Sequence, residues 1–206
     1  GLKLVKTKYA LILNPDTILE KNAIENFLDI ARMTDDFWLI GPANDQAMTF
    51  DFKGKKLRGV KNIKGFAIFF NLEKFNKTYF DENFFLFFEE IDLCKRVIKN
   101  KGKIYLSEKI IIKHEGASSV NKDNSLELEK NRNWHWMWST FYFHKKHKGY
   151  FAAFILIFPK LLSAFLKSLL YLFIFNKLKR DIYLSRLNGI LNSMLGRKSW
   201  YRPSID

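Results

Sequence analysis

Short apolar runs alternate with helical patterns over the first 120 residues of the chain. Each run is continuous and bounded by polar or turn-forming residues, which is typical of strands in α/β sheets that are covered on both faces. The predicted strands cover residues 9–13, 38–41, 65–70, 103–106 and 110–113. Apolar residues at helical spacing predict helices at 23–31 and 89–101, and a short helix at 72–75. The polar segment 43–62 predicts a loop or a hairpin. This alternation indicates an α/β domain.

The pattern changes after residue 120. Residues 125–147 predict a long helix rich in tryptophan, whose rings would lie at a lipid interface or pack on the domain. Residues 150–175 are almost wholly apolar, and their few Lys and Ser side chains recur on one helical face. Pro159 divides this segment into pieces shorter than the roughly 20 residues that a membrane span needs. We therefore expect it to lie in a membrane interface, ahead of crossing the membrane or forming a buried hairpin.

The distribution of charge also favours binding of this segment to a membrane. The formal net charge is +14, and residues 144–206 hold twelve Lys or Arg against two Asp. Because these cations surround an apolar segment, the expected partner is an anionic membrane surface. Basic and aromatic residues also occur in nucleic-acid-binding proteins, but here the aromatic residues are mostly Phe within apolar runs, so no nucleic-acid partner is expected. The single cysteine, Cys94, excludes an internal disulfide and fits a reducing compartment.

Candidate chemistry centres on residues 84–96, which read FFLFFEEIDLCKR. The acids Glu89, Glu90 and Asp92 follow an aromatic run and fall in the first turn of a predicted helix. Apolar surroundings favour the protonated acid, whereas the helix N-terminus favours the anion, so one of these acids can serve as a base. The alternative is that they merely favour the helix start, or hold Arg96 or a loop.

A second candidate lies at the end of the first strand. Pro15 cannot continue a sheet ladder, so the strand stops and Asp16 is presented at its carboxyl end. In open α/β sheets, ligands bind outside the carboxyl ends of the strands. Without other motifs, an Asp after Pro is more often a turn residue or a helix cap.

Several motifs together, in this order, resemble the bacterial family 2 glycosyltransferases, and in particular a rhamnosyltransferase-like branch that builds lipopolysaccharide and other surface glycans. They are LILNPDT (11–17), the segment 65–67, YFDENFFLFFEEIDLCKR (79–96), KHEGASS (113–119), SRLNGILNSMLGR and SWYRP (185–203). The resemblance extends over nearly all of the chain. It implies a GT-A fold and transfer of a sugar, with inversion, from a nucleotide diphosphate donor to a hydroxyl, aided by Mg²⁺ or Mn²⁺.

The resemblance also implies roles for single residues. Asp16 matches the second acid of the family's DxD-type motif and would bind the metal and the donor, beside Asn14, which replaces the first acid. Glu90 stands where the family usually has its catalytic Asp, and Glu89 and Asp92 match neighbouring acids. His114 matches a histidine that may be a metal or diphosphate ligand, and is otherwise a strand-end residue.

The acceptor side is expected to include three residues, because aromatic rings can stack on the apolar face of a sugar. They are Gly65, Phe66 and Phe85.

The family begins with a strand and loop that hold the nucleotide, and nothing before Gly1 matches them. We therefore expect an N-terminally truncated enzyme: an α/β, GT-A-like (Rossmann-like) mixed sheet lacking its first βα unit in residues 1–120, an aromatic and basic helix in 121–148, and a membrane-associated helical region in 149–206. Its expected substrates are a nucleotide-diphosphate sugar and a glycan or glycolipid acceptor at the cytoplasmic face of the bacterial inner membrane. A non-catalytic membrane scaffold and a basic nucleic-acid-binding protein are the alternatives.

Overall fold

The structure is a computed structural model that describes residues 1–43, 57–114 and 125–203. It divides into two compact units. The sheet unit contains Gly1–Asp81 and Glu90–Ser118, and the helical unit contains Glu82–Glu89 and Ser119–Asp206. The protein is thus mixed α/β, with a mixed sheet and five α-helices among the described residues.

The sheet unit is built on a five-stranded sheet with the order β1-β5-β3-β6-β4. Its strands are β1 (Tyr9–Leu13), β3 (Phe37–Pro42), β4 (Leu57–Gly59), β5 (Ala67–Asn71) and β6 (Lys103–Ser107). β5 runs antiparallel to both of its neighbours, β3 is parallel to β6, and β4 is antiparallel to β6. The strands β1, β3 and β6 therefore point the same way. The remaining elements are η1 (Leu2–Leu4), β2 (Thr17–Leu19), α1 (Ala23–Met33), η2 (Leu72–Lys74), α2 (Glu89–Lys99) and β7 (Ile112–His114).

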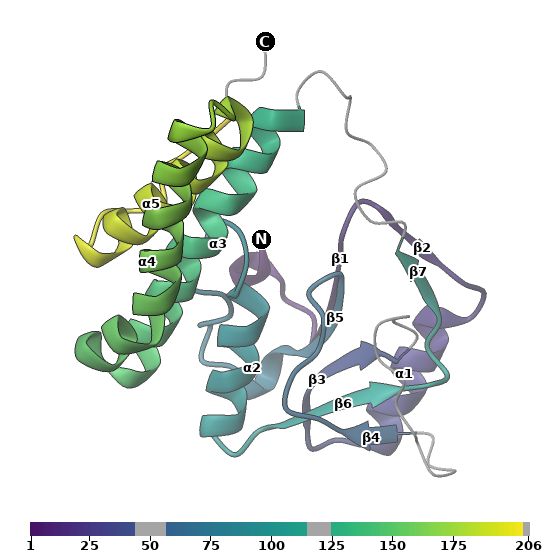
Figure 1. Cartoon of the computed structure of the whole chain (residues 1–206). Coiled ribbons are helices and arrows are strands. Elements are labelled where there is room, and N and C mark those ends of the chain that lie inside the picture. Colours follow the sequence, from purple (N-terminus) through teal and green to yellow (C-terminus); the bar gives the residue numbers. More distant parts are fainter. Residues whose placement is uncertain (44–56, 115–124, 204–206) are drawn as a thin grey trace. The chain divides into compact units, whose positions relative to one another are not determined.

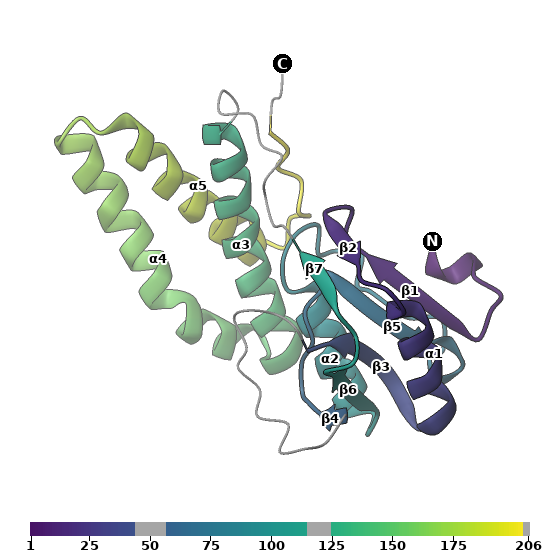
Figure 2. The ribbon, with the colours of Figure 1, turned by 90° about the vertical axis from the view of Figure 1, so that its right-hand side faces the viewer.

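Helices cover both faces of this sheet (Figures 1 and 2). On one face, Phe27 of α1 stacks on Phe69 of β5, with ring centroids 4.9 Å apart. On the other face, Leu93 of α2 belongs to the same apolar cluster as Ile68 of β5. Because successive residues of a strand point to opposite faces, every residue of β5 is buried. The apolar run from which this strand was predicted is thus explained by its two covered faces.

The apolar run at 9–13 also predicts a central strand, and this prediction is wrong for β1, although its residues pack against apolar clusters on both faces of the sheet. In the described sheet β1 pairs only with β5, and all five of its residues are half-buried. The apolar run YALIL indicates that both faces of the strand are covered. It does not indicate how many strands pair with it. The segment 43–62 was predicted as a loop or hairpin; its residues 57–59 form β4, and residues 44–56 lie outside the described part of the chain.

The helical unit contains α3 (Ser125–Lys148), α4 (Tyr150–Phe173) and α5 (Lys177–Met194), each of which packs against the other two. The crossing of α3 and α5 is very close. A Cβ atom added at Gly189 of α5 would lie 2.3 Å from the carbonyl oxygen of Trp134 in α3. One turn further along α5, the buried Ser193 hydroxyl donates to the carbonyl of Trp138 at 2.9 Å. Small side chains thus allow the two backbones to approach.

Two of the tryptophans of α3 pack inside the helical unit and hold the C-terminal segment. Trp134 is buried and stacks on Tyr201, with ring centroids 5.8 Å apart. The indole N–H of the buried Trp138 donates to the carbonyl of Arg197 at 3.0 Å. The lipid-interface reading is therefore wrong for these two residues, because their rings are enclosed by protein. Trp136, the third tryptophan of α3, is 45% exposed.

Pro159 does not divide the apolar segment, contrary to the sequence-based prediction. α4 is one continuous helix of 24 residues with Pro159 inside it. A proline removes one backbone hydrogen bond and crowds the preceding turn, which packing of the flanking turns can offset. Within the described residues, α4 is long and apolar enough to cross a membrane.

We predict that Gly189→Ala destabilises the helical unit by about 2–3 kcal/mol, because the added methyl group must push α3 and α5 apart. In an ordinary helix the same change stabilises, since alanine is the better helix former by about 1 kcal/mol. Urea unfolding followed by tryptophan fluorescence tests the sign, since four of the five tryptophans lie in this unit. Leu191→Ala, at an exposed position of α5, is the control. A Gly189→Ala protein as stable as the parent would contradict the close crossing.

Candidate functional site

A tight turn presents the first candidate acid. The backbone N–H and the hydroxyl of Thr17 both bind the carbonyl oxygen of Asn14, at 3.2 and 2.7 Å. Pro15 occupies the second position of this four-residue turn, where its fixed φ is favourable. The backbone N–H of Asn14 donates to the carbonyl of Phe66 at 2.8 Å, which ties the turn to the start of β5. The carboxylate of Asp16 is thereby fixed beyond the end of β1.

His114 lies directly beside Asp16. The small antiparallel sheet of β2 and β7 pairs Thr17 with His114, and the Nε2 atom of His114 is 3.3 Å from Oδ2 of Asp16. The imidazole also stacks on the ring of Phe66, with centroids 4.9 Å apart and planes 13° apart. Three separate segments therefore fix these two polar side chains next to each other.

The segment preceding β5 connects this pair to the second candidate acid. A Cβ atom added at Gly65 would lie 3.5 Å from Cβ and 3.8 Å from the carboxyl carbon of Glu90, so the Glu90 side chain runs alongside the glycine. The next residue, Phe66, is the one that stacks on His114. Five of the predicted site residues, Asp16, His114, Gly65, Phe66 and Glu90, thus form one continuous series of neighbours within the sheet unit, and Asn14 joins it through its backbone.

Glu90 is held in an environment that suits a base. Burial raises the pKa of its carboxyl group, while the backbone N–H groups of Glu90 and Ile91 and the charge of Lys64 act in the opposite direction. Its Oε2 atom is buried and has no hydrogen-bond partner among the described residues. A carboxylate that keeps one oxygen without a partner can accept a proton from a molecule bound beside it.

The donor set at Asp16 and His114 fits a divalent cation that is completed by other ligands. Oδ1 of Asp16 is buried and has no hydrogen-bond partner among the described residues. No group of three or more His, Cys, Asp or Glu residues able to hold a metal occurs in that part of the chain. Mg²⁺ commonly binds one or two carboxylates together with water and substrate phosphates. Two protein ligands are therefore sufficient only if a diphosphate supplies others.

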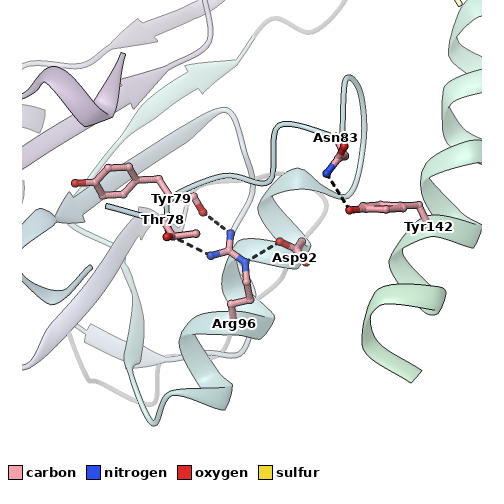
Figure 3. A network of polar contacts seen from close by, with 6 residues as sticks. All are labelled: Thr78, Tyr79, Asn83, Asp92, Arg96 and Tyr142. Atoms are coloured by element: carbon pink, nitrogen blue, oxygen red, sulfur yellow. Dashed lines mark hydrogen bonds and ion pairs between the residues drawn. The ribbon is translucent and has the colours of Figure 1, made fainter. Parts of the chain in front are cut away.

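Asp92, two residues after Glu90 in α2, has contacts that stabilise the fold (Figure 3). The side chain is fully buried, and its Oδ2 accepts a hydrogen bond from Nε of Arg96 at 2.8 Å. The same guanidinium donates to the carbonyls of Thr78, at 3.2 Å, and of Tyr79. Asp92 and Arg96 thereby fasten α2 to the segment before it, in agreement with the structural alternative considered for this acid.

Two predicted site residues, Phe85 and Glu89, belong to the helical unit. The guanidinium of Arg202 lies 3.4 Å from the ring centroid of Phe85, and the ring of His135 lies 5.0 Å from it. This half-exposed ring is therefore partly covered within its own unit. Glu89 is the first residue of α2.

The two residues before Glu89 have a strained backbone. Phe87 and Phe88 have φ values of 65° and 69°, in the left-handed region that bulky side chains rarely adopt. Both rings pack on Trp136, with centroids 5.2 and 5.3 Å away. Such strain persists only where packing enforces it, and it clusters at functional sites.

Other features of the sheet unit lie apart from these residues. A pocket of 580 Å³ is lined by the first residues of β6 and by β4, and it contains none of the predicted site residues. It lies at the amino end of β6, whereas Asp16 follows the carboxyl end of the parallel strand β1. Burial raises the pKa of the Cys94 thiol to about 11, so this cysteine is protonated at neutral pH and is no nucleophile.

Comparisons of the chain with protein families, curated proteins and solved structures find no match.

The strand predicted at residues 110–113 overlaps β7, but β2 and its pairing with β7 were not predicted, because β2 has only three residues and shows no periodicity. Sequence reasoning also left the role of Asp92 open. The spacing of Asp92 and Arg96, four residues apart on a predicted helix, was the signal that could have assigned this acid to an ion pair.

We predict that Glu90→Gln makes the sheet unit more stable at neutral pH. Because burial raises the folded-state pKa of Glu90 above its unfolded value, ionisation opposes folding, and stability is lost as the pH rises through the folded-state pKa. The glutamine variant lacks this loss, so the difference between the two proteins should grow from acid to neutral pH. Hydrogen exchange of β5 and α2 amides measures it, with the exposed Glu25→Gln as control. A stability difference that shrinks as the pH rises would show that ionisation of Glu90 does not oppose folding.

We further predict that Arg96→Met destabilises the sheet unit by about 3 kcal/mol, since it removes the guanidinium that pairs with the buried Asp92 carboxylate. The matched control is Arg32→Met, which removes an exposed partner of Asp29 in α1 and should change stability by less than about 1 kcal/mol. Urea denaturation, with hydrogen exchange of the β5 and α2 amides as the readout, compares the stabilities of the two variants. Equal effects would show that the Asp92–Arg96 contact contributes no more than a surface pair.

Proposed function

We propose that the protein is an inverting, metal-dependent glycosyltransferase that moves a sugar from a nucleotide-diphosphate donor to a hydroxyl of a lipid-linked or cell-surface glycan. The observation that carries the proposal is the series of contacts within the sheet unit that joins Asp16 and His114, through Phe66 and Gly65, to Glu90. Glycosyl transfer needs two kinds of group close together: one that holds a diphosphate and one that accepts a proton. The Asp16–His114 pair and Glu90 supply these two chemistries.

In the proposed reaction, a hydroxyl oxygen of the acceptor attacks the anomeric carbon of the donor sugar. The new C–O bond forms as the bond to the diphosphate oxygen breaks, and the bonding electrons leave with the nucleoside diphosphate. The acceptor proton moves to the Glu90 carboxylate. One base on the face opposite the leaving group gives inversion, and Gly65 leaves space beside that base because it has no side chain.

Asp16 and His114 would hold Mg²⁺ or Mn²⁺ together with the donor diphosphate, with the Asn14 side chain at the same turn. Such a cation offsets the negative charge that develops on the diphosphate as it leaves. The carboxylate provides the hard oxygen ligand that these ions prefer, and the buried Oδ1 of Asp16 is available for it.

The architecture is compatible with the GT-A fold that the sequence resemblance implies. Helices lie on both faces of a mixed sheet, and a two-stranded sheet flanks the acidic turn after β1. Gly65 and Phe66, at this edge, would contact the acceptor. The expected location remains the cytoplasmic face of a bacterial inner membrane.

A non-catalytic scaffold is the competing proposal, and turnover distinguishes the two. We expect the full-length protein, incubated with a panel of nucleotide-diphosphate sugars and glycolipid acceptors, to transfer one sugar in the presence of Mg²⁺ or Mn²⁺ and to lose this activity with EDTA. Asp16→Asn and Glu90→Gln should each lower kcat at least about 100-fold. The pH–rate profile should rise above the ordinary glutamate range, because Glu90 must be ionised to act as a base and burial raises its pKa.

The control for turnover is Glu25→Gln, which removes an exposed carboxyl from the same unit. Normal glycan assembly by the Asp16→Asn and Glu90→Gln proteins would overturn the enzyme proposal and favour the scaffold. Tight, salt-sensitive retention of DNA or RNA at physiological salt would instead favour the nucleic-acid-binding alternative.

A further inference from the structure

α4 exposes most of its large apolar side chains. Its buried residues are Ala153, Ile157, Ala164 and Ser168. The outer face of α4, defined by exposed residues that repeat at helical spacing, consists of Phe151, Ile155, Leu162, Leu166, Leu169 and Phe173. The exposed fraction reaches 77% for Phe151 and 75% for Phe173. A water-facing helix normally shows the opposite arrangement, so this face is suited to an apolar environment.

One flank of the outer face carries positive charge. Lys167 of α4 and Arg186 of α5 both lie over the ring of Tyr183, 5.2 and 4.9 Å from its centroid. Tyr171 stacks on Tyr183 at 5.5 Å, and Lys179 lies 5.4 Å from the centroid of Tyr171. In the described residues, no carboxylate lies within ion-pair distance of these three cations. This flank therefore attracts anions from solution.

A pocket of 320 Å³ opens on the same flank, between the three helices of the helical unit. The cations Lys160 and Arg186, the hydroxyls of Ser163 and Tyr183, and the indole of Trp136 are among its lining groups. Two cations and two hydroxyl donors around one cavity match the oxygen atoms of a phosphate group. The apolar face, the cationic flank and this pocket are thus neighbours on one helical hairpin.

We propose that the hairpin of α4 and α5 binds the surface of an anionic phospholipid bilayer. The outer face of α4 lies among the acyl chains, parallel to the membrane, and the cationic flank lies at the level of the lipid phosphates, one of which enters the pocket. Lysines at the edge of an apolar face can extend their charged ends to this level while their stems remain in the apolar layer. The negative surface potential of the membrane strengthens the attraction.

The packing of α4 favours the in-plane arrangement over a membrane span. Its inner face is covered by α3 and α5 from Ala153 to Ser168. A span would carry α5 into the hydrocarbon, including the Arg180–Asp181 ion pair and Arg186, at a large desolvation cost. This inference does not depend on glycosyl transfer, because vesicle binding can succeed or fail whether or not the protein turns over a sugar nucleotide.

Sedimentation with lipid vesicles tests the apolar face. We expect the full chain to bind vesicles that contain phosphatidylglycerol at least tenfold more tightly than vesicles of phosphatidylcholine alone. Leu162→Asn combined with Leu166→Asn should weaken binding to anionic vesicles at least tenfold. Because both leucines are exposed, the variant should fold normally, as circular dichroism can verify. The matched control replaces two exposed apolar residues of α1, with Ile24→Asn and Met33→Gln, and should bind like the parent.

The cationic flank and the orientation have separate tests. Lys160→Glu with Lys167→Glu should abolish the preference for phosphatidylglycerol. Lys99→Glu with Lys101→Glu changes the net charge equally on the sheet unit and should retain most of this preference. Extraction of the bound protein by alkaline carbonate is expected for an in-plane helix, whereas retention in the vesicle pellet would refute the in-plane arrangement. Failure of the parent protein to bind anionic vesicles would overturn the whole inference.

Discussion

The complete burial of β5 determines where the candidate site residues lie. This strand is hydrogen-bonded to β1 on one side and to β3 on the other, and helices cover both of its faces. Its position fixes the two residues just before it. The carbonyl oxygen of Phe66 accepts a hydrogen bond from the backbone N–H of Asn14, and the Phe66 ring stacks on His114. Gly65 lies beside the Glu90 side chain. A hydrophobic strand at the centre of the unit thus sets the spacing of polar groups at its edge.

Glu90 and Asp92 show how one short helix can give two carboxylates opposite properties. Asp92 is buried against Arg96, whose guanidinium also binds two backbone carbonyls, so its charge is compensated. Glu90 faces the Gly65 segment, and one of its buried oxygens has no hydrogen-bond partner within the described residues. A compensated acid stabilises the fold, whereas an uncompensated acid retains a tendency to take up a proton. Chemical reactivity is therefore expected at Glu90.

Much of the sheet unit could be predicted from sequence, because strands covered on both faces require continuous apolar runs such as residues 67–70. The turn at Asn14 was predictable from Pro15, which has no N–H group for a sheet ladder. The edge position of β1 could not be predicted, since the apolar run carries no information on neighbouring strands. The resemblance placed Asp16 and His114 at the same metal, but the pairing of β2 with β7 that brings them together could not be predicted, because it joins segments nearly 100 residues apart.

In the helical unit, local rules failed where packing dominates. Pro159 reads as a helix breaker, yet it lies inside a continuous helix. Gly189 has no evident role in the sequence, because its importance depends on the backbone of Trp134 in another helix. Of the residues that the resemblance to glycosyltransferases singles out, Asp16, His114 and Glu90 lie in the sheet unit and Glu89 does not, and the resemblance did not distinguish the ion-paired Asp92 from Glu90.

The reversed arrangement of α4 also affects which mutations the chain can accept. On a helix of a water-soluble protein, outward positions vary freely among polar residues and inward positions must stay large and apolar. Along α4 the inward positions at Ala153, Ile157 and Ala164 are enclosed by protein, while the outward positions can exchange Leu, Ile and Phe with one another. Selection would therefore preserve the apolar character of the outward positions and the side-chain size of the inward positions.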